Sequence, residues 1–300
     1  MRVFVTGATG LIGSALCGAL LGKGHAVTAL SRAPDAARRL PLGARVVTGD
    51  PAVPGPWQED LASCDACLHL AGEPIAEGRW TREKKRRLAT SRVDSTERVA
   101  EVIAARGPTV LVQGSAVGFY GSRGDEVLDE ASAAGQGFLA DLSRRWEAAA
   151  APAARRARVV LLRTGVVLAR DGGALPRLTL PFKLFAGGPI GAGAFWFPWI
   201  HLRDEVGLAL LALEDGRAAG PVNATAPEPV RNRELAGALG RALGRPSFVR
   251  TPEAAVRLAL GEMAEAVLAS QRVVPRRALE LGYSFRFSTI GDALRDLLGR

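Results

Sequence analysis

The sequence predicts an α/β protein built on a doubly wound parallel sheet, with a smaller C-terminal lobe. Short apolar strands alternate with helix-length segments, a glycine-rich turn joins the first strand to the first helix, and the composition changes after Arg163. Strands separated by helices are typical of βαβ units, and right-handed crossovers then produce a doubly wound sheet. We expect one domain over residues 1–165 and a second lobe over 166–300, with segments from about 195 to 225 returning to the first domain.

The strands expected in the first domain are short and apolar. They cover residues 2–5, 25–30, 45–48, 67–71, 109–112 and 159–162. Apolar residues at helical spacing predict helices between most of them, over residues 11–21, 58–63, 81–106 and 137–150. This alternation is the reason for expecting a parallel sheet.

The second half begins with a segment of different character. Residues 172–199 are rich in glycine, proline and aromatic side chains, which is typical of a functional loop or lid. Helices are expected over residues 232–243, 252–268 and 288–298. We expect this lobe to cover the carboxyl ends of the strands, where open α/β sheets bind ligands. Its aromatic residues either stack on a ring-bearing substrate or fill the core between the lobes, and both interpretations stay open.

Composition and charge exclude several classes of protein. The net charge of +9 comes from arginines spread along the chain, whereas a nucleic-acid surface needs a clustered basic stripe, so we do not expect a nucleic-acid partner. Cys64 and Cys67 lack the further ligands of a zinc site, and the three cysteines form no disulfide framework. No apolar run approaches a membrane span. We therefore expect a cytoplasmic protein without a membrane anchor or a metal; the sequence indicates no particular oligomeric state.

A glycine-rich turn lies between the first strand and the first helix. Gly7 permits the tight turn, Gly10 lets the backbone approach a pyrophosphate, and Gly13 lets the helix pack close to the sheet. The N-terminus of that helix offers free N–H groups and a positive dipole end to phosphates. The sequence therefore predicts a Rossmann-type dinucleotide site with contacts from Gly7, Thr9, Gly10, Leu11, Ile12 and Gly13. A turn that binds no ligand is the alternative.

The end of the second strand predicts which dinucleotide binds. Sites for NAD usually place an acid about 20 residues after the turn, whereas an arginine there suits the 2′-phosphate of NADP. Here the strand ends at Ser31 and Arg32, and no acid appears before Asp35. We therefore expect NADP(H), held in part by Ser31 and Arg32. An ordinary surface arginine at position 32 is the alternative.

Further motifs are similar to those of a known family. They are residues 69–72 (HLAG), 72–75 (GEPI), 79–81 (RWT), 91–93 (SRV), 114–121 (GSAVGFYG), 146–147 (WE), 181–183 (PFK), 199–204 (WIHLRD) and 220–227 (GPVNATAP). With them the chain resembles the atypical or extended short-chain dehydrogenases/reductases. The resemblance is closer to their epimerase-like subfamily called sugar nucleotide epimerase family proteins, which includes human short-chain dehydrogenase family 39U. It covers essentially the whole chain.

The resemblance also implies where a cofactor and the reacting groups lie. Contacts to the cofactor are implied for Leu70, Ala71, Gly72 and Arg163. Glu73 and Arg92 lie where their strand end and helix should face the cofactor, and either could also polarise a substrate. Ser115 matches a family serine that hydrogen-bonds a substrate carbonyl, although a serine at a strand end also serves as a loop anchor. Tyr120 could supply an acidic hydroxyl, although its position commonly packs against cofactor and substrate. These two residues are the candidate catalytic groups.

The usual proton-transfer pair of the superfamily is absent. Those enzymes use Tyr-x-x-x-Lys, in which the lysine lowers the pKa of the tyrosine. This chain has two tyrosines, Tyr120 and Tyr283, and neither is followed by a lysine four residues on. Phe138 and Leu142 stand in the place of the pair.

Three functions follow from these observations. The first is an NADP(H)-dependent oxidoreductase or epimerase with a rearranged proton donor, acting on a small, ring-bearing substrate. The second is a non-catalytic NADP(H)-binding regulatory or sensor protein, which loss of the pair would permit. Nucleic-acid binding through the basic surface ranks last.

Overall fold

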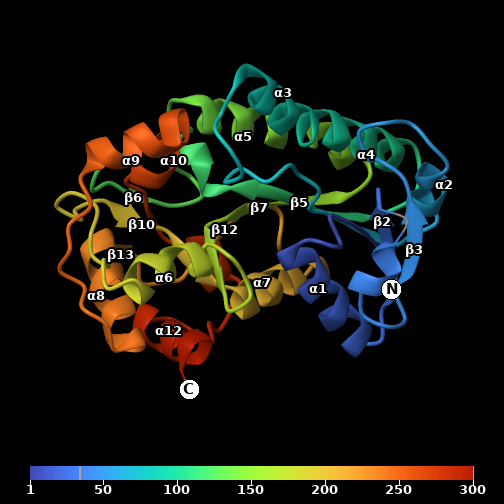
Figure 1. The fold of residues 1–300 in the computed structure, drawn as a ribbon. Coiled ribbons are helices and arrows are strands. Elements are labelled where there is room, and N and C mark those ends of the chain that lie inside the picture. The colour runs from blue at the N-terminus through green and yellow to red at the C-terminus, as the bar shows by residue number, and fades with distance from the viewer. Residues whose placement is uncertain (34, 300) are drawn as a thin grey trace.

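A seven-stranded parallel sheet forms the centre of the molecule in the computed structural model, which describes residues 1–33 and 35–299 (Figure 1). The strand order is β12-β7-β5-β4-β1-β2-β3, and each neighbouring pair is parallel. The order reverses between β1 and β4, which confirms the predicted doubly wound fold. The strands are β1 (Arg2–Thr6), β2 (Ala26–Ser31), β3 (Arg45–Thr48), β4 (Ala66–His69), β5 (Val110–Ala116), β7 (Arg158–Thr164) and β12 (Gly220–Ala224).

Helices cover both faces of this sheet (Figure 1). On one face lie α1 (Leu11–Gly22) and α7 (Leu202–Glu214), which contact each other over a core that includes Leu16, Leu20 and Leu208. On the other face lie α2 (Trp57–Ala62), α4 (Val93–Ala105) and α5 (Phe138–Ala149), followed by the short helix η3 (Ala151–Arg155). Two separate cores result, because the sheet divides them.

The helix expected over residues 81–106 is wrong in one respect, since the structure has two helices there. Helix α3 (Arg82–Thr90) begins at Thr81, whose hydroxyl accepts a hydrogen bond from the N–H of Lys84. The chain then turns at Ser91 and Arg92 before α4. The break lets Ser91 accept a hydrogen bond from the N–H of Glu73, and it turns Arg92 toward the end of β4.

The C-terminal lobe has a core of its own. It is built on α6 (Leu175–Lys183), α8 (Asn232–Leu243) and α12 (Ile290–Leu298), with buried residues such as Leu175, Trp199 and Leu239. Its small sheets contain β8 (Val166–Ala169), β9 (Gly172–Gly173), β10 (Trp196–Phe197), β11 (Trp199–His201) and β13 (Val230–Arg231). The segment expected as a loop thus contains α6. The helix forms although Pro181 lies inside it, because Leu175, Thr179 and Phe182 are buried along one side.

A second part of this lobe reaches back to the first domain. Helices α9 (Glu253–Leu260) and α10 (Ala264–Leu268), joined by η4 (Gly261–Met263), replace the single helix expected over 252–268. Lys85 on α3 pairs with Glu262 on η4, and the Arg79 guanidinium donates to the carbonyl of Leu258. The remaining elements are η1 (Ala36–Arg39), η2 (Val117–Tyr120), β6 (Val127–Leu128), β14 (Arg272–Val273), which pairs with β6, and α11 (Arg276–Glu280).

Within the described residues, every helix is too short or too polar to cross a lipid bilayer.

Candidate functional site

The glycine turn after β1 is fixed by close backbone contacts. Gly7 has a φ of +66°, and a Cβ atom on it would lie 2.7 Å from the carbonyl carbon of Leu70. A Cβ on Gly13 would lie 2.2 Å from the carbonyl oxygen of Gly7. No side chain fits at either position, since real Cβ atoms do not approach backbone this closely. The turn and the first helical turn of α1 are therefore packed directly on each other.

The N-terminus of α1 is open beyond this turn. Gly10 is the N-cap residue, is exposed, and supplies no side-chain cap. Thr9, Leu11 and Ile12 are half-buried around it. The first N–H groups of α1 are thus left for an anion, and the helix dipole favours negative charge there.

A buried hydrogen-bond chain joins this turn to the end of β4. The hydroxyl of Thr6 lies 2.7 Å from Nδ1 of His69 and accepts hydrogen bonds from the N–H groups of Leu70 and Ala71, both at 3.1 Å. The other ring nitrogen of His69 lies 3.1 Å from the hydroxyl of Ser95. Burial lowers the pKa of His69 to about 3, so the ring is neutral. These side chains hold the predicted contact segment at Leu70 and Ala71 beside the glycine turn.

Positive side chains surround the ends of β2 and β4. Arg32 is 74% exposed and its guanidinium lies 4.0 Å from a carboxylate oxygen of Asp50. Ser31 is buried, and its hydroxyl accepts from the N–H of Ala33. At the end of β4, the Glu73 carboxylate accepts a 2.8 Å hydrogen bond from Lys84. This bond holds the pKa of Glu73 below its usual value, although partial burial acts in the opposite direction. Glu73 therefore offers no free negative charge to a cofactor.

Arg92, like Lys84, is a buried cation at this edge. Its Nη1 donates to the carbonyl of Glu73 at 3.0 Å, and its guanidinium carbon lies 5.1 Å from the centre of the Trp146 ring. A Cβ on Gly72 would lie 3.1 Å from that guanidinium carbon, so the glycine lets Arg92 pack against the chain. Burial lowers the pKa of Arg92 to about 10, which leaves it charged at neutral pH.

A cavity of about 430 Å³ opens beside β5 and β7, between the first domain and α9–α10. Trp80 and Phe138 meet edge-to-face in its wall, with ring centres 5.3 Å apart. Most of the wall is apolar or glycine: Ile75, Trp80, Ala116, Val117, Gly118, Gly121, Gly137, Phe138, Leu139, Ala140, Gly165, Val166, Ala266, Leu268 and Ala269. Its polar members are Ser122, Gln136, Thr164, Arg257, Glu265 and Gln271.

The two candidate catalytic hydroxyls lie behind this wall. Neither Ser115 nor Tyr120 belongs to the cavity lining, whereas their neighbour Ala116 does. The Ser115 hydroxyl donates to Glu147 at 2.6 Å. Tyr120 is fully buried; its hydroxyl donates to Asn223 at 2.7 Å and accepts from Arg163 at 3.0 Å. Burial raises the pKa of Tyr120 to about 12, although the Arg163 charge acts in the opposite direction.

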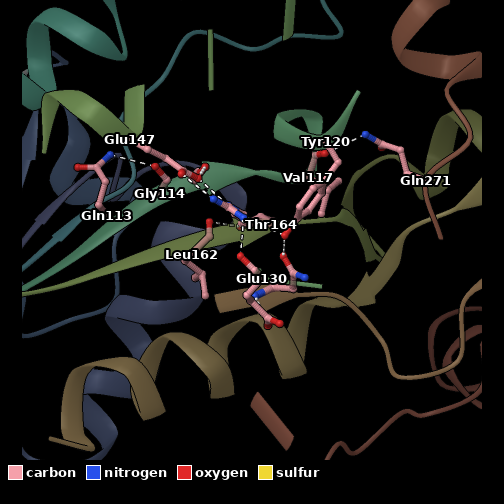
Figure 2. Close-up of polar contacts among 12 residues, drawn as sticks. Gln113, Gly114, Val117, Tyr120, Glu130, Glu147, Leu162, Thr164 and Gln271 are labelled. Carbon is pink, nitrogen blue, oxygen red and sulfur yellow. Dashed lines mark hydrogen bonds and ion pairs between the residues drawn. The ribbon is translucent and has the colours of Figure 1, made fainter. Parts of the chain in front are cut away.

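Arg163, expected to contact a cofactor, instead bonds to Glu147 and Tyr120 of this buried network, both of which are labelled in Figure 2. Its Nε and Nη2 form a two-point ion pair with Glu147 at 2.8 and 2.9 Å, and both side chains are less than a tenth exposed. Its guanidinium carbon also lies 3.6 Å from the centre of the Phe119 ring. The parallel register places Arg163 beside Ser115, so β5, β7 and α5 are joined by one set of charged hydrogen bonds.

Comparisons with known proteins agree with this architecture. A family model described as the NAD dependent epimerase/dehydratase family matches residues 3–224. The chain belongs to this family. A second model, described as a domain of unknown function, matches residues 251–297, which include α9 and α10 of the cavity wall.

The family members most similar to this chain include proteins from plants and animals. The "Epimerase family protein SDR39U1 homolog, chloroplastic" of Arabidopsis thaliana is 42% identical over 303 residues, which are 99% of this chain and 87% of the relative. The crystal structure of human epimerase family protein SDR39U1 (isoform2) with NADPH is 37% identical, covers 99% of both chains and gives a TM-score of 0.88. The structure of MoeE5 in complex with UDP-glucuronic acid and NAD shares the fold. It is 22% identical, the match covers 98% of this chain and 96% of MoeE5, and the TM-score is 0.79.

Several residues of this epimerase-family site were not found from the sequence. Thr6, His69 and Ser95 act through burial, which no motif revealed. Trp80 was noted only within a motif, and Arg257 and Glu265 were not singled out, because they reach the cavity from α9 and α10. The described residues contain no cluster of His, Cys, Asp or Glu side chains that could hold a metal ion.

Proposed function

We propose that this chain is an NADP(H)-dependent oxidoreductase or epimerase of the epimerase/dehydratase family, which works without the usual Tyr-x-x-x-Lys pair on a small, ring-bearing compound. The observation that carries the proposal is the position of two features at the carboxyl ends of the strands. The open glycine turn of α1 and the cavity beside β5 and β7 flank the point where the strand order reverses. Open α/β sheets bind cofactor and substrate at that point.

The residues present fit a dinucleotide. Backbone N–H groups at Leu11 and Ile12 suit a pyrophosphate, whereas the N–H of Gly10 donates to the carbonyl of Gly7 at 3.0 Å and closes the turn. Gly7 and Gly13 keep the turn free of side chains. When bound, NADP(H) supplies a hydride donor or acceptor. We assign the remaining contacts to Thr9, Ser31, Arg32, Leu70, Ala71, Gly72, Glu73 and Arg92.

The charges at the end of β2 favour the 2′-phosphorylated cofactor. Arg32 is exposed, and the carboxylate that pairs with it within the described residues, Asp50, stays 4.0 Å away, which leaves the guanidinium able to pair with a phosphate. Glu73, the acid that follows β4, is already paired with Lys84. The human relative solved with NADPH supports the same choice.

The cavity wall favours an apolar ring over a sugar. A buried sugar needs a partner for each hydroxyl, and burying polar groups without partners costs free energy. Most of the wall offers apolar side chains instead, among them Trp80, Phe138 and Val166. Gln271 also lines the cavity, but its side-chain amide already donates to the carbonyls of Val117 and Gly121.

Ser115 and Tyr120 act in this proposal as positioning residues. Their hydroxyls hold Glu147 and Arg163, and this network fixes the strand ends whose next residues, Ala116 and Thr164, line the cavity. Ser115→Ala and Tyr120→Phe should then lower kcat more than they raise KM for substrate, and leave the affinity for NADPH unchanged.

A non-catalytic NADP(H) sensor is the second candidate, and one observation favours it. Phe138, the residue in place of the usual tyrosine, lies in the cavity wall and cannot move a proton. Turnover distinguishes the two candidates: consumption of NADPH with aryl ketones, aryl aldehydes or nucleotide sugars supports the enzyme, whereas tight NADPH binding without turnover across these compounds supports the sensor.

The cofactor assignment is tested by titrating NADPH and NADH. NADPH should bind more tightly than NADH. Arg32→Ala should weaken the binding of NADPH by about 1.5 to 3 kcal/mol and leave the binding of NADH unchanged. Arg39→Ala is the matched control, since this exposed arginine pairs with Asp35. Equal affinities for the two cofactors, before and after Arg32→Ala, would contradict the assignment.

A further inference from the structure

Glu205, in the first turn of α7, is an acid in an unusual position. Its side chain is completely buried. Its Oε1 accepts a 2.8 Å hydrogen bond from the hydroxyl of Thr164, and its Oε2 has no hydrogen-bond partner within the described residues. Thr164 is the last residue of β7 and also belongs to the cavity wall (Figure 2). One threonine therefore connects a buried acid to the cavity.

The surroundings of Glu205 favour the neutral acid. No lysine, arginine or histidine in the described parts of the chain pairs with it. The groups that face this region are its neighbour Asp204, whose carboxylate accepts from the N–H of Arg286, and the hydroxyl of Tyr283, which donates to Asp204 at 3.0 Å. Burial raises the pKa of Glu205 to about 8, against the smaller opposing effect of the Thr164 hydrogen bond. A buried carboxylate with one unpaired oxygen would be costly, so the proton stays on.

The protonation state of Glu205 sets what Thr164 can offer. A threonine hydroxyl has one proton to donate and two lone pairs. An ionised Glu205 accepts only, so Thr164 must give that proton to it. A neutral Glu205 can donate its own proton to the Thr164 oxygen, which frees the hydroxyl proton. The other acceptor near this hydroxyl, the carbonyl of Leu162, is 3.4 Å away and competes weakly.

We propose that Glu205 and Thr164 form a two-residue relay that presents the Thr164 hydroxyl as a hydrogen-bond donor to a carbonyl oxygen in the cavity. The inference rests on the proposed function, because it needs a ligand in that cavity, and it narrows the ligand to an aromatic ketone or aldehyde. The ring would lie against the apolar wall, and its carbonyl would accept from Thr164. Glu205 is a positioning residue here, since it acts through Thr164.

The experiment compares two probes of similar shape in the full-length protein with NADPH present. Acetophenone carries a carbonyl acceptor and ethylbenzene does not. Thr164→Val removes the hydroxyl at nearly constant shape. It should weaken the binding of acetophenone about 2- to 10-fold and leave the binding of ethylbenzene unchanged. Acetophenone affinity of the wild type should also fall as the pH rises from about 6 to about 10, because Glu205 ionises over this range.

Glu205→Gln provides the matched control. A glutamine amide can donate to the Thr164 oxygen at every pH, so this variant should bind acetophenone as well as the wild type does at low pH and lose the pH dependence. Infrared difference spectra of wild type against Glu205→Gln, without ligand, should show a protonated carboxyl band at about pH 6 that disappears at about pH 10.

Two results would overturn the relay: no protonated carboxyl band at low pH, or acetophenone affinity that is absent or indifferent to Thr164→Val. These failures are distinct from failure of the proposed function. Wild-type protein that binds no NADPH would overturn the proposed function, whereas NADPH binding with either negative result overturns the relay alone.

Discussion

The glycine turn between β1 and α1 and the cavity beside β5 and β7 are built in different ways. The turn between β1 and α1 lies within residues 6–13, and its shape follows from backbone contacts that exclude any side chain at Gly7 and Gly13. The cavity wall draws on residues between 75 and 271, from both lobes. A site held by local backbone geometry is specified by a short motif, whereas a site assembled from distant segments depends on packing and buried charge.

The two regions also differ in the forces that hold them. Steric exclusion fixes the glycine turn, and uncharged hydrogen bonds through Thr6 and neutral His69 attach it to β4. The strand ends beside the cavity are held by the buried Glu147–Arg163 ion pair. Substitutions should therefore damage the two regions in separable ways.

The largest expected effect belongs to the glycine turn. Gly13→Ala would place a Cβ 2.2 Å from the oxygen of Gly7, and neither backbone segment can move without opening α1. The free energy of unfolding should fall by about 4 kcal/mol or more, and NADPH binding should be lost. Urea denaturation and cofactor titration measure both. Gly22→Ala is the control at the other end of α1, where no atom lies within 4 Å of the new Cβ. This variant should be as stable as the wild type or more stable by up to about 1 kcal/mol. Similar behaviour of the two variants would remove the steric argument.

The next largest loss of stability is expected when the buried ion pair beside the cavity is broken. Glu147→Ala leaves the guanidinium of Arg163 charged, buried and without its partner, which should cost about 3 to 5 kcal/mol of stability. NADPH affinity of the folded variant should stay close to that of the wild type. Asp141→Ala is the control on the same helix; this residue forms an exposed pair with Arg144, worth about 0 to 1 kcal/mol. Equal losses in the two variants would show that the buried pair has no special role.

Stability should depend on pH through Glu205. Burial raises its folded-state pKa to about 8 from the ordinary value of 4.5, so the folded protein holds a proton that the unfolded chain has released. The contribution of Glu205 to stability therefore declines as pH rises from about 4.5 to 8, by at most about 1.4 kcal/mol per pH unit, and is constant above that range. Thermal unfolding across this pH range should show that the stability of Glu205→Gln increases relative to that of the wild type as the pH rises. A constant difference between them would mean that Glu205 is ionised when folded.

The smallest effect concerns the hydroxyl of Tyr120. Tyr120→Phe leaves Asn223 and Arg163 each without one buried hydrogen-bond partner, which should cost about 1 to 3 kcal/mol. Ser122→Ala, after the same strand and exposed, should cost less. If Tyr120→Phe were as stable as the wild type, the network would contribute little to fixing the strand ends.

The comparison between the regions explains which expectations succeeded. The strand at residues 45–48 and the helix at 232–243 were predicted with their observed bounds, and the doubly wound sheet was predicted from the alternation of strands and helices. The helix at 81–106 failed because the break at Ser91 and Arg92 depends on contacts with Glu73 rather than on a proline or glycine. Helix α6 was missed because its segment is rich in proline and glycine, yet tertiary burial stabilises it. The domain boundary at residue 165 and the cytoplasmic location stay predictions.

The sequence by itself determined the sheet and the glycine turn, and it predicted a 2′-phosphorylated cofactor, because periodicity, glycine and local charge act over a few residues. Only the tertiary structure decided the states of the polar groups. It turned Ser115 and Tyr120 away from the cavity, paired Arg163 with Glu147, and buried Glu205 behind Thr164. The physical reason is that exposure and partners set the pKa and the free hydrogen-bonding capacity of a side chain, and both arise from segments that meet only when the chain folds.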